Sequence, residues 1–327
     1  MCALRAHSYL VRALLSLSIR AQHVPAHSLD PHMLPFFEQP VWHLGPLTIH
    51  AFGVAVAVGL WVSLAMAERR FSAASLDRAI GNRLGGWMLV TGILGAHLFS
   101  VIFYFPDRLR ADPWLLLRIW EDISSFGGMI GGIIGASLFF ATRAQQLGAR
   151  TRLAYLDAVA FVFPFGLAFG RLGCALAHDH PGSVTTFPLA ISLGSAPAQA
   201  YIQRVYEAAG QSLPVAAGTM GFHDLGLDEL LFLLFIVLPA FSYWNRQRRQ
   251  PGFYLKAFAV LYLPVRFALE SLRISDVRYL RLTPAQWVAA LALAALPLVA
   301  MDRRRVRFAI SGAIMLATAW ACWGGPR

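Results

Sequence analysis

Charged residues are scarce in this sequence. Only 14% of the 327 residues are charged, whereas 57% are hydrophobic. A soluble domain would carry nearer a quarter charged residues, or about 25%. The deficit argues against one or two soluble domains and favours a single helical bundle in a lipid bilayer.

Lysine is almost missing. Of 28 basic residues only Lys256 is lysine, so the net charge of +11 comes from arginine. A basic protein can bind nucleic acid. Here, however, the arginines form short clusters between apolar runs, as in loops that face anionic lipid. We therefore expect a lipid bilayer around the chain and no nucleic-acid partner.

Cysteine is also rare, with only Cys2, Cys174 and Cys322, far apart along the chain. This pattern excludes a CxxC motif and a disulfide framework.

Long apolar runs dominate the rest of the sequence. A transmembrane helix needs about 20 mostly apolar residues. We predict an all-α integral membrane protein with seven or eight transmembrane helices. The candidate spans are 46–66, 85–105, 125–142, 155–172, 228–244, 253–271, 283–301 and the shorter 308–323.

The two ends differ from this core. The apolar stretch 13–19 is closely bracketed by Arg12 and Arg20 and is too short to cross a bilayer. We predict that residues 1–32 are a dispensable extension, that 33–302 form the transmembrane domain, and that 303–327 are a tail holding the eighth candidate span.

The basic residues predict an orientation. Fifteen of them follow odd-numbered spans and seven follow even-numbered spans. Because loops rich in arginine stay in the cytoplasm, we expect an external N-terminus. Residues 173–227 then form a small external head, in which 197–209 is the best candidate for a helix.

Three ionisable residues fall inside or at the ends of predicted spans. Arg171 stands between glycines, and Arg266 and Glu270 are four apart on one helical face. Charges at this depth cost about 2.5–3.5 kcal/mol each. The arginines could clamp one lipid phosphate. The alternatives are an arginine that snorkels to the interface and a structural ion pair.

Glycines and histidines supply further candidates. Gly127 and Gly128 open the third span, either for close helix packing or to line a path for lipid tails. His178, Asp179 and His180 follow Arg171, and His223 precedes the fifth span. Their spacing fits no standard zinc motif, so we expect no metal. The roles left open are acid–base or hydrogen-bonding work near Arg171, and plain surface histidines.

Five stretches resemble, in the same order, segments of bacterial prolipoprotein diacylglyceryl transferases. The third stretch is similar to the family signature G-R-x-G-N, and the last is similar to its sixth-span motif R-F/I-x-x-E-x-x-R. The resemblance runs from about Leu34 to about Asp302. The stretches are PVWHLGPLTIHAFG, ADPWLLLRIWE with SSFGGMIGG, FGRLGCALAHDHPG, HDLGLDE and VRFALESLR.

The resemblance implies an enzyme of the bacterial cytoplasmic (inner) membrane that needs no cofactor. It would move diacylglyceryl from phosphatidylglycerol to the lipobox cysteine of a prolipoprotein signal peptide. Arg171 matches the arginine that holds the lipid head group, and Arg266 and Glu270 match the functional pair of the sixth span. Asp179 takes the place of the signature acid, and Glu229 matches the glutamate after the head.

Three polar positions of the family depart here. The signature asparagine is Cys174, the catalytic histidine is Phe126, and a first-span tyrosine is Phe52. His178 or His180 is then the candidate base, with Asp179 orienting one of them. The alternatives are a catalytically silent paralogue that binds lipid or lipoprotein, and a membrane transporter.

Overall fold

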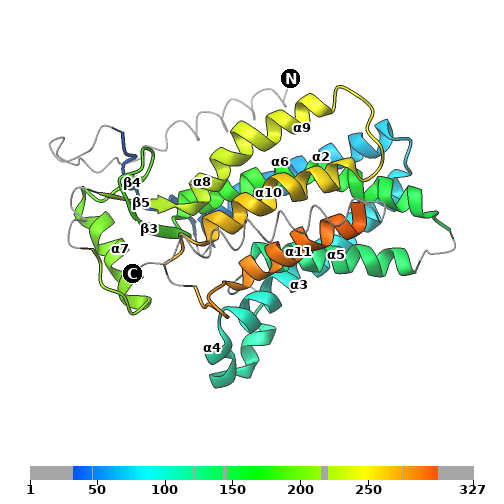
Figure 1. Cartoon of the computed structure of the whole chain (residues 1–327). Helices are drawn as coiled ribbons and strands as arrows, with labels where there is room; N and C mark the ends of the chain where they lie inside the picture. The colour runs from blue at the N-terminus through cyan, green and yellow to red at the C-terminus, as the bar shows by residue number, and fades with distance from the viewer. Residues whose placement is uncertain are drawn as a thin grey trace.

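The computed structural model describes residues 32–300 except 46, 120, 122, 143–145, 215–219 and 275. Long helices lie side by side in a bundle, and a small sheet with one helix sits at one end (Figure 1). The helical elements are α2 (Ala51–Ala73), α3 (Arg78–Phe103), α4 (Pro106–Ala111), η1 (Pro113–Leu117), α5 (Ser125–Ala141), α6 (Ala149–Ala177), α7 (Ala196–Ala208), α8 (Leu225–Phe232), η3 (Leu233–Val237), α9 (Leu238–Trp244), α10 (Phe253–Glu270) and α11 (Pro284–Ala300).

Four helices in the described part of the chain are long and apolar enough to cross a membrane. They are α2, α3, α6 and the continuous stretch Leu225–Trp244, while α5 and Pro284–Leu296 are shorter apolar helices. On α2 and α3 large apolar side chains such as Trp61 and Val90 stay exposed. An apolar outer face suits lipid rather than water. The prediction of a helical membrane bundle is confirmed to this extent.

Several helix ends differ from the predicted spans, and two of these differences matter for the site. The first helix begins at Ala51 because β1 (Val41–Leu44) and β2 (Leu47–His50) form an antiparallel hairpin before it. The fourth helix does not end at residue 172 but continues to Ala177, so Arg171 lies inside it. The first 31 residues and the candidate span 308–323 lie outside the described part of the chain.

The segment between α6 and α8 holds the sheet. β5 (Gly221–Asp224) pairs with β3 (Pro181–Thr185) and β4 (Ile191–Ser192), all antiparallel. The prediction of a purely α fold is wrong here. The strands escaped prediction because they are short and because an irregular register interrupts the pairing of β3 with β5. The expected helix is present as α7, whose first turn is capped by the Ser195 hydroxyl.

Glycines bring α3 and α5 into close contact. A Cβ added at Gly127 would lie 2.4 Å from the Gly95 carbonyl oxygen, and one at Gly131 would lie 2.1 Å from the Thr91 carbonyl oxygen. Backbones approach this closely only where side chains are absent. The packing interpretation of the glycine-rich stretch is therefore confirmed, and this contact sets the position of the α5 N-terminus.

We predict that Gly131→Ala lowers the stability of the bundle. The new methyl group would push against the backbone of Thr91, and such overpacking costs about 1–3 kcal/mol. Gly85→Ala in α3 is the matched control, since nothing lies within 4 Å of a Cβ there. Thermal unfolding in detergent measures both, and equal stability of the two variants would contradict the close packing.

Candidate functional site

Arg171 is buried in the last two turns of α6. It is 2% exposed. Its Nε lies 2.7 Å from Oε1 of Glu229 in α8, and its Nη2 donates to the Ser125 hydroxyl of α5 at 3.0 Å. A snorkelling arginine would reach the interface instead, so that interpretation is wrong.

Glu229 also reaches α10. Its Oε2 lies 3.5 Å from Nε of Arg266, and its Oε1 accepts a hydrogen bond of 2.5 Å from the Tyr262 hydroxyl. One buried carboxylate thus joins arginines from two helices, as α6 and α10 pack on either side of it. Asp224 holds this end of α8 in place by accepting from the Leu227 N–H at 3.1 Å.

Glu270 extends the charged network. It pairs with Nη1 of Arg266 at 2.5 Å and lies 3.6 Å from Nε of Arg273, and it accepts from the Thr283 hydroxyl at 3.1 Å. Arg273 in turn pairs with Asp276 at 2.7 Å. The predicted ion pair between Arg266 and Glu270 is present. It belongs to a network in which three arginines are matched by Glu229, Glu270 and Asp276.

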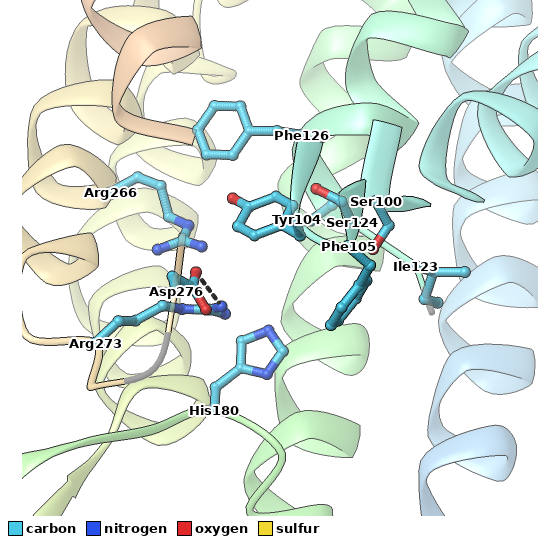
Figure 2. Close-up of a pocket in the computed structure, with 11 residues that line it drawn as sticks. Ser100, Tyr104, Phe105, Ile123, Ser124, Phe126, His180, Arg266, Arg273 and Asp276 are labelled. Atoms are coloured by element: carbon cyan, nitrogen blue, oxygen red, sulfur yellow. Dashed lines mark hydrogen bonds and ion pairs between the residues drawn. The ribbon is translucent and has the colours of Figure 1, made fainter. Parts of the chain in front are cut away.

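A cavity of about 150 Å³ opens beside this network. Figure 2 shows Arg266 and Arg273 entering it from one side and Tyr104 and Phe105 from the other, with His180 between them. Arg171 is absent from the wall, although its partner Ser125 belongs to it. The residues that line the cavity are Ser100, Tyr104, Phe105, Ile123, Ser124, Ser125, Phe126, His180, Arg266, Arg273 and Asp276.

Two groups of the cavity wall have shifted pKa values. Burial acts to lower the pKa of Arg273, but the carboxylates of Glu270 and Asp276 outweigh it and raise that pKa. Burial raises the pKa of Asp276, against the opposing effect of Arg273. The Arg273 guanidinium therefore stays charged and offers donors to an anion in the cavity.

The predicted histidines separate in space. Only His180 lines the cavity, and its Nδ1 lies 2.7 Å from Oδ1 of Asp179. His178 is 3% exposed, and its Nδ1 pairs with Asp224 Oδ2 at 2.6 Å. His223 forms a separate pair with Asp228 at 3.0 Å.

Two phenylalanines stand where the family resemblance places a histidine and a tyrosine. Phe126, where the resemblance puts a histidine, is 2% exposed, and the Arg266 guanidinium carbon lies 5.6 Å from its ring centre. The ring therefore packs under a charged group of the cavity. Phe52 meets α6 near Gly173, where an added Cβ would lie 3.0 Å from the Phe52 ring. Gly127 and Gly128 face α3 and do not line the cavity.

Several site residues were not predicted from the sequence. Tyr262 stands one turn before Arg266 in α10, so helical spacing on one face could have indicated it. Arg273 lies beyond the end of α10 but closes the stretch VRFALESLR, so that motif could have indicated it. Tyr104, Ser125 and Asp276 come from loops or helix ends that carry no such pattern. Only the packing of α3, α5 and the segment after α10 brings them to the cavity.

The chain resembles a known family over most of its length. The model of the prolipoprotein diacylglyceryl transferase family matches residues 39–301. Phosphatidylglycerol–prolipoprotein diacylglyceryl transferases of Escherichia coli K12 and O1:K1 and of Shigella boydii serotype 18 are each 27% identical over 309 residues. Each alignment covers 90% of this chain and 96% of the relative. The resemblance inferred from the motifs is confirmed.

We predict that Tyr262→Phe destabilises the network. The change removes the hydrogen bond to Glu229, and a bond to a buried charged group contributes about 1.5–3 kcal/mol. The control is Tyr243→Phe, because that ring is 63% exposed. A denaturant titration that finds both variants as stable as the unchanged protein would remove Tyr262 from the network.

Proposed function

Because this chain belongs to the prolipoprotein diacylglyceryl transferase family, we propose that it moves diacylglyceryl from phosphatidylglycerol to the lipobox cysteine of a prolipoprotein signal peptide. The observation that carries the proposal is the cavity where two arginines and His180 meet. The guanidinium groups match a phosphate, and the imidazole suits a thiol that must lose its proton.

The reaction requires charge to move from sulfur to phosphate. The thiolate attacks the glycerol carbon that bears the phosphate, so a C–S bond forms and the C–O bond breaks. Glycerol-1-phosphate leaves with the electron pair. Arg266 and Arg273 would stabilise the charge that develops on this leaving group. Arg171 lies behind the wall and would act by holding Ser125 and Glu229 in place.

His180 is the proposed proton acceptor for the thiol. It lines the cavity next to Arg273 and Asp276, whereas the His178 ring lies between Phe36 and Phe37. We assign His178 a structural role, in which its pair with Asp224 supports the turn into the sheet. Glu270 orients Arg266, and Asp179 orients His180.

We predict that Arg266→Lys weakens the binding of phosphatidylglycerol although the charge is kept. Lysine is a point charge and cannot make two parallel contacts with one phosphate. The loss of one charge-assisted bond costs about 1.5–3 kcal/mol, which is about tenfold or more in affinity. Arg204→Lys, at an exposed position on α7, is the control. Unchanged lipid binding by Arg266→Lys would show that this arginine is only structural.

We predict that His180→Ala slows transfer by roughly 10²–10⁴, the usual effect of losing a general base. The assay is the mass gain of a lipobox peptide in purified protein reconstituted with phosphatidylglycerol. His43→Ala in the β1–β2 hairpin should transfer at the normal rate. Normal transfer by His180→Ala would show that this histidine is not the general base. No transfer by the unchanged protein, with lipid still bound, would instead indicate a silent paralogue and direct attention to Phe126.

The proposed placement in the membrane has seven spans and an external N-terminus. The spans are α2, α3, α5, α6, α8 to α9, α10 and α11, and the head with α7 then lies outside the cell. The support is the asymmetry of the basic residues in the loops. In this placement the cavity opens toward the external face, since His180 comes directly before the head strand β3.

We predict opposite reactivity for single cysteines at positions 200 and 247. Ala200→Cys on α7 should react with an impermeant thiol reagent added to intact spheroplasts, and Gln247→Cys after α9 should react only after lysis. Both should be introduced into a protein whose Cys2 and Cys322 are serine. Labelling of position 247 but not position 200 in intact spheroplasts would reverse the orientation.

A further inference from the structure

A cluster of three different metal-binding side chains lies where α6 ends. Sγ of Cys174, a carboxylate oxygen of Asp179 and a ring nitrogen of His180 lie within 4.8 Å of one another. Among the described residues this is the one such group of three. The spacing in the sequence predicts no metal. The turn at His178, which has a φ of 50°, brings Asp179 and His180 close to the last turn of the helix.

The three ligand atoms lie within 4.8 Å of one another, so small shifts of the side chains would bring them around one ion. Zinc binds sulfur at about 2.3 Å and nitrogen or oxygen at about 2.0–2.2 Å, so tetrahedral ligand atoms stand about 3.3–3.6 Å apart. The Nδ1 of His180 and the Oδ1 of Asp179 lie 2.7 Å apart, and the contact lacks the geometry of a hydrogen bond at Nδ1. To bind the same ion, these two atoms need to move slightly farther apart. The Asp179 side chain is 37% exposed and has room to turn.

The Cys174 sulfur has a supporting contact within α6. Nη1 of Arg171 donates to Sγ of Cys174 at 3.6 Å, the kind of supporting contact that orients a metal ligand. Arg171 is itself neutralised by Glu229 at 2.7 Å, so it adds little repulsion toward a cation. A thiolate with the Asp179 carboxylate would match the two charges of a divalent ion.

We propose that Cys174, Asp179 and His180 bind one divalent transition-metal ion of the zinc class, with a fourth position open to the cavity for the substrate thiol. Cysteine, histidine and carboxylate are the ligands that this class of ion takes, and three protein ligands with an open position are typical of catalytic zinc sites. The opening follows from His180, which is both a member of the cluster and part of the cavity wall.

The role of the ion in transfer rests on the proposed function. A thiol that coordinates such an ion is deprotonated. The proton of the substrate thiol passes to water next to exposed Asp179, and the bound sulfur keeps its electron pair. That pair forms the C–S bond as the C–O bond to phosphate breaks. Without the ion, His180 accepts the thiol proton as proposed above. In the loaded protein His180 is a ligand, and the ion activates the thiol in its place. This activation makes up for a histidine that is Phe126 here.

The binding test uses purified full-length protein, stripped of metal and then titrated with zinc or cobalt(II). The unchanged protein should bind one ion, and cobalt should give a thiolate-to-metal charge-transfer band. Cys174→Asn restores the residue of the family signature. It should lose the band and weaken zinc binding at least about 100-fold, since even losing a residue that only supports a ligand costs about 10–100-fold.

The control for this test is His223→Ala, which removes a histidine paired with a carboxylate at 3.0 Å outside the cluster. It should keep both the ion and the band. No band in the unchanged protein, or equal binding by Cys174→Asn, would overturn the site. The band belongs to the unchanged protein, so this result does not depend on how well the variant folds.

The transfer assay separates this proposal from the proposed function. Stripped protein, in which His180 is left to accept the proton, should transfer more slowly and should recover the full rate with zinc. If the ion binds but stripped protein still transfers at the full rate, the role of the ion in activating the thiol is wrong and the proposed function stands. If the ion binds with the predicted band and neither form transfers, the proposed function fails while the metal site remains.

Discussion

The site depends on one buried carboxylate, Glu229, which lies between two buried arginines. Arg171 comes from α6 at 2.7 Å and Arg266 from α10 at 3.5 Å. Removing one charge from such a network leaves its partner buried without compensation. This costs far more stability than breaking an ion pair on the surface. The carboxylate therefore holds α6, α8 and α10 in one arrangement. The cavity exists because that arrangement turns Arg266 toward α3 and α5.

The other wall of the cavity depends on packing rather than charge. The glycines of α3 and α5 let their backbones meet, and this contact places Ser125 and Phe126 opposite Arg266. The short sheet and the turn at His178 then bring His180 into the cavity wall. The arginines of the cavity wall, the α3–α5 contact and the turn at His178 come from distant parts of the chain. A reaction that joins an apolar lipid to a polar thiol needs such a site, with water limited and donors already in place.

Much of the fold could be predicted from the sequence, because long apolar runs separated by arginine clusters are typical of helices that cross a bilayer. Each of the first seven runs overlaps a described helix. The buried charges Arg171, Arg266 and Glu270 were found from their depth alone. The residues that these charges meet could not be predicted, since contacts across helices leave no regular spacing. The sheet was missed because its strands are short. The cluster of Cys174, Asp179 and His180 was missed because it requires a left-handed histidine, which sequence patterns do not indicate.

The measurement that tests the central role of Glu229 most directly is a double-mutant cycle between it and Arg171. The free energy of unfolding would be measured for Arg171→Met, for Glu229→Gln and for the double variant. Glu229→Gln leaves Arg171 without its buried carboxylate, and Arg171→Met leaves Glu229 with only the more distant Arg266. If the two side chains form a buried pair, the double variant should therefore recover stability. The expected coupling energy is about 1–3 kcal/mol. Additivity of the two single changes within about 0.5 kcal/mol would contradict the account.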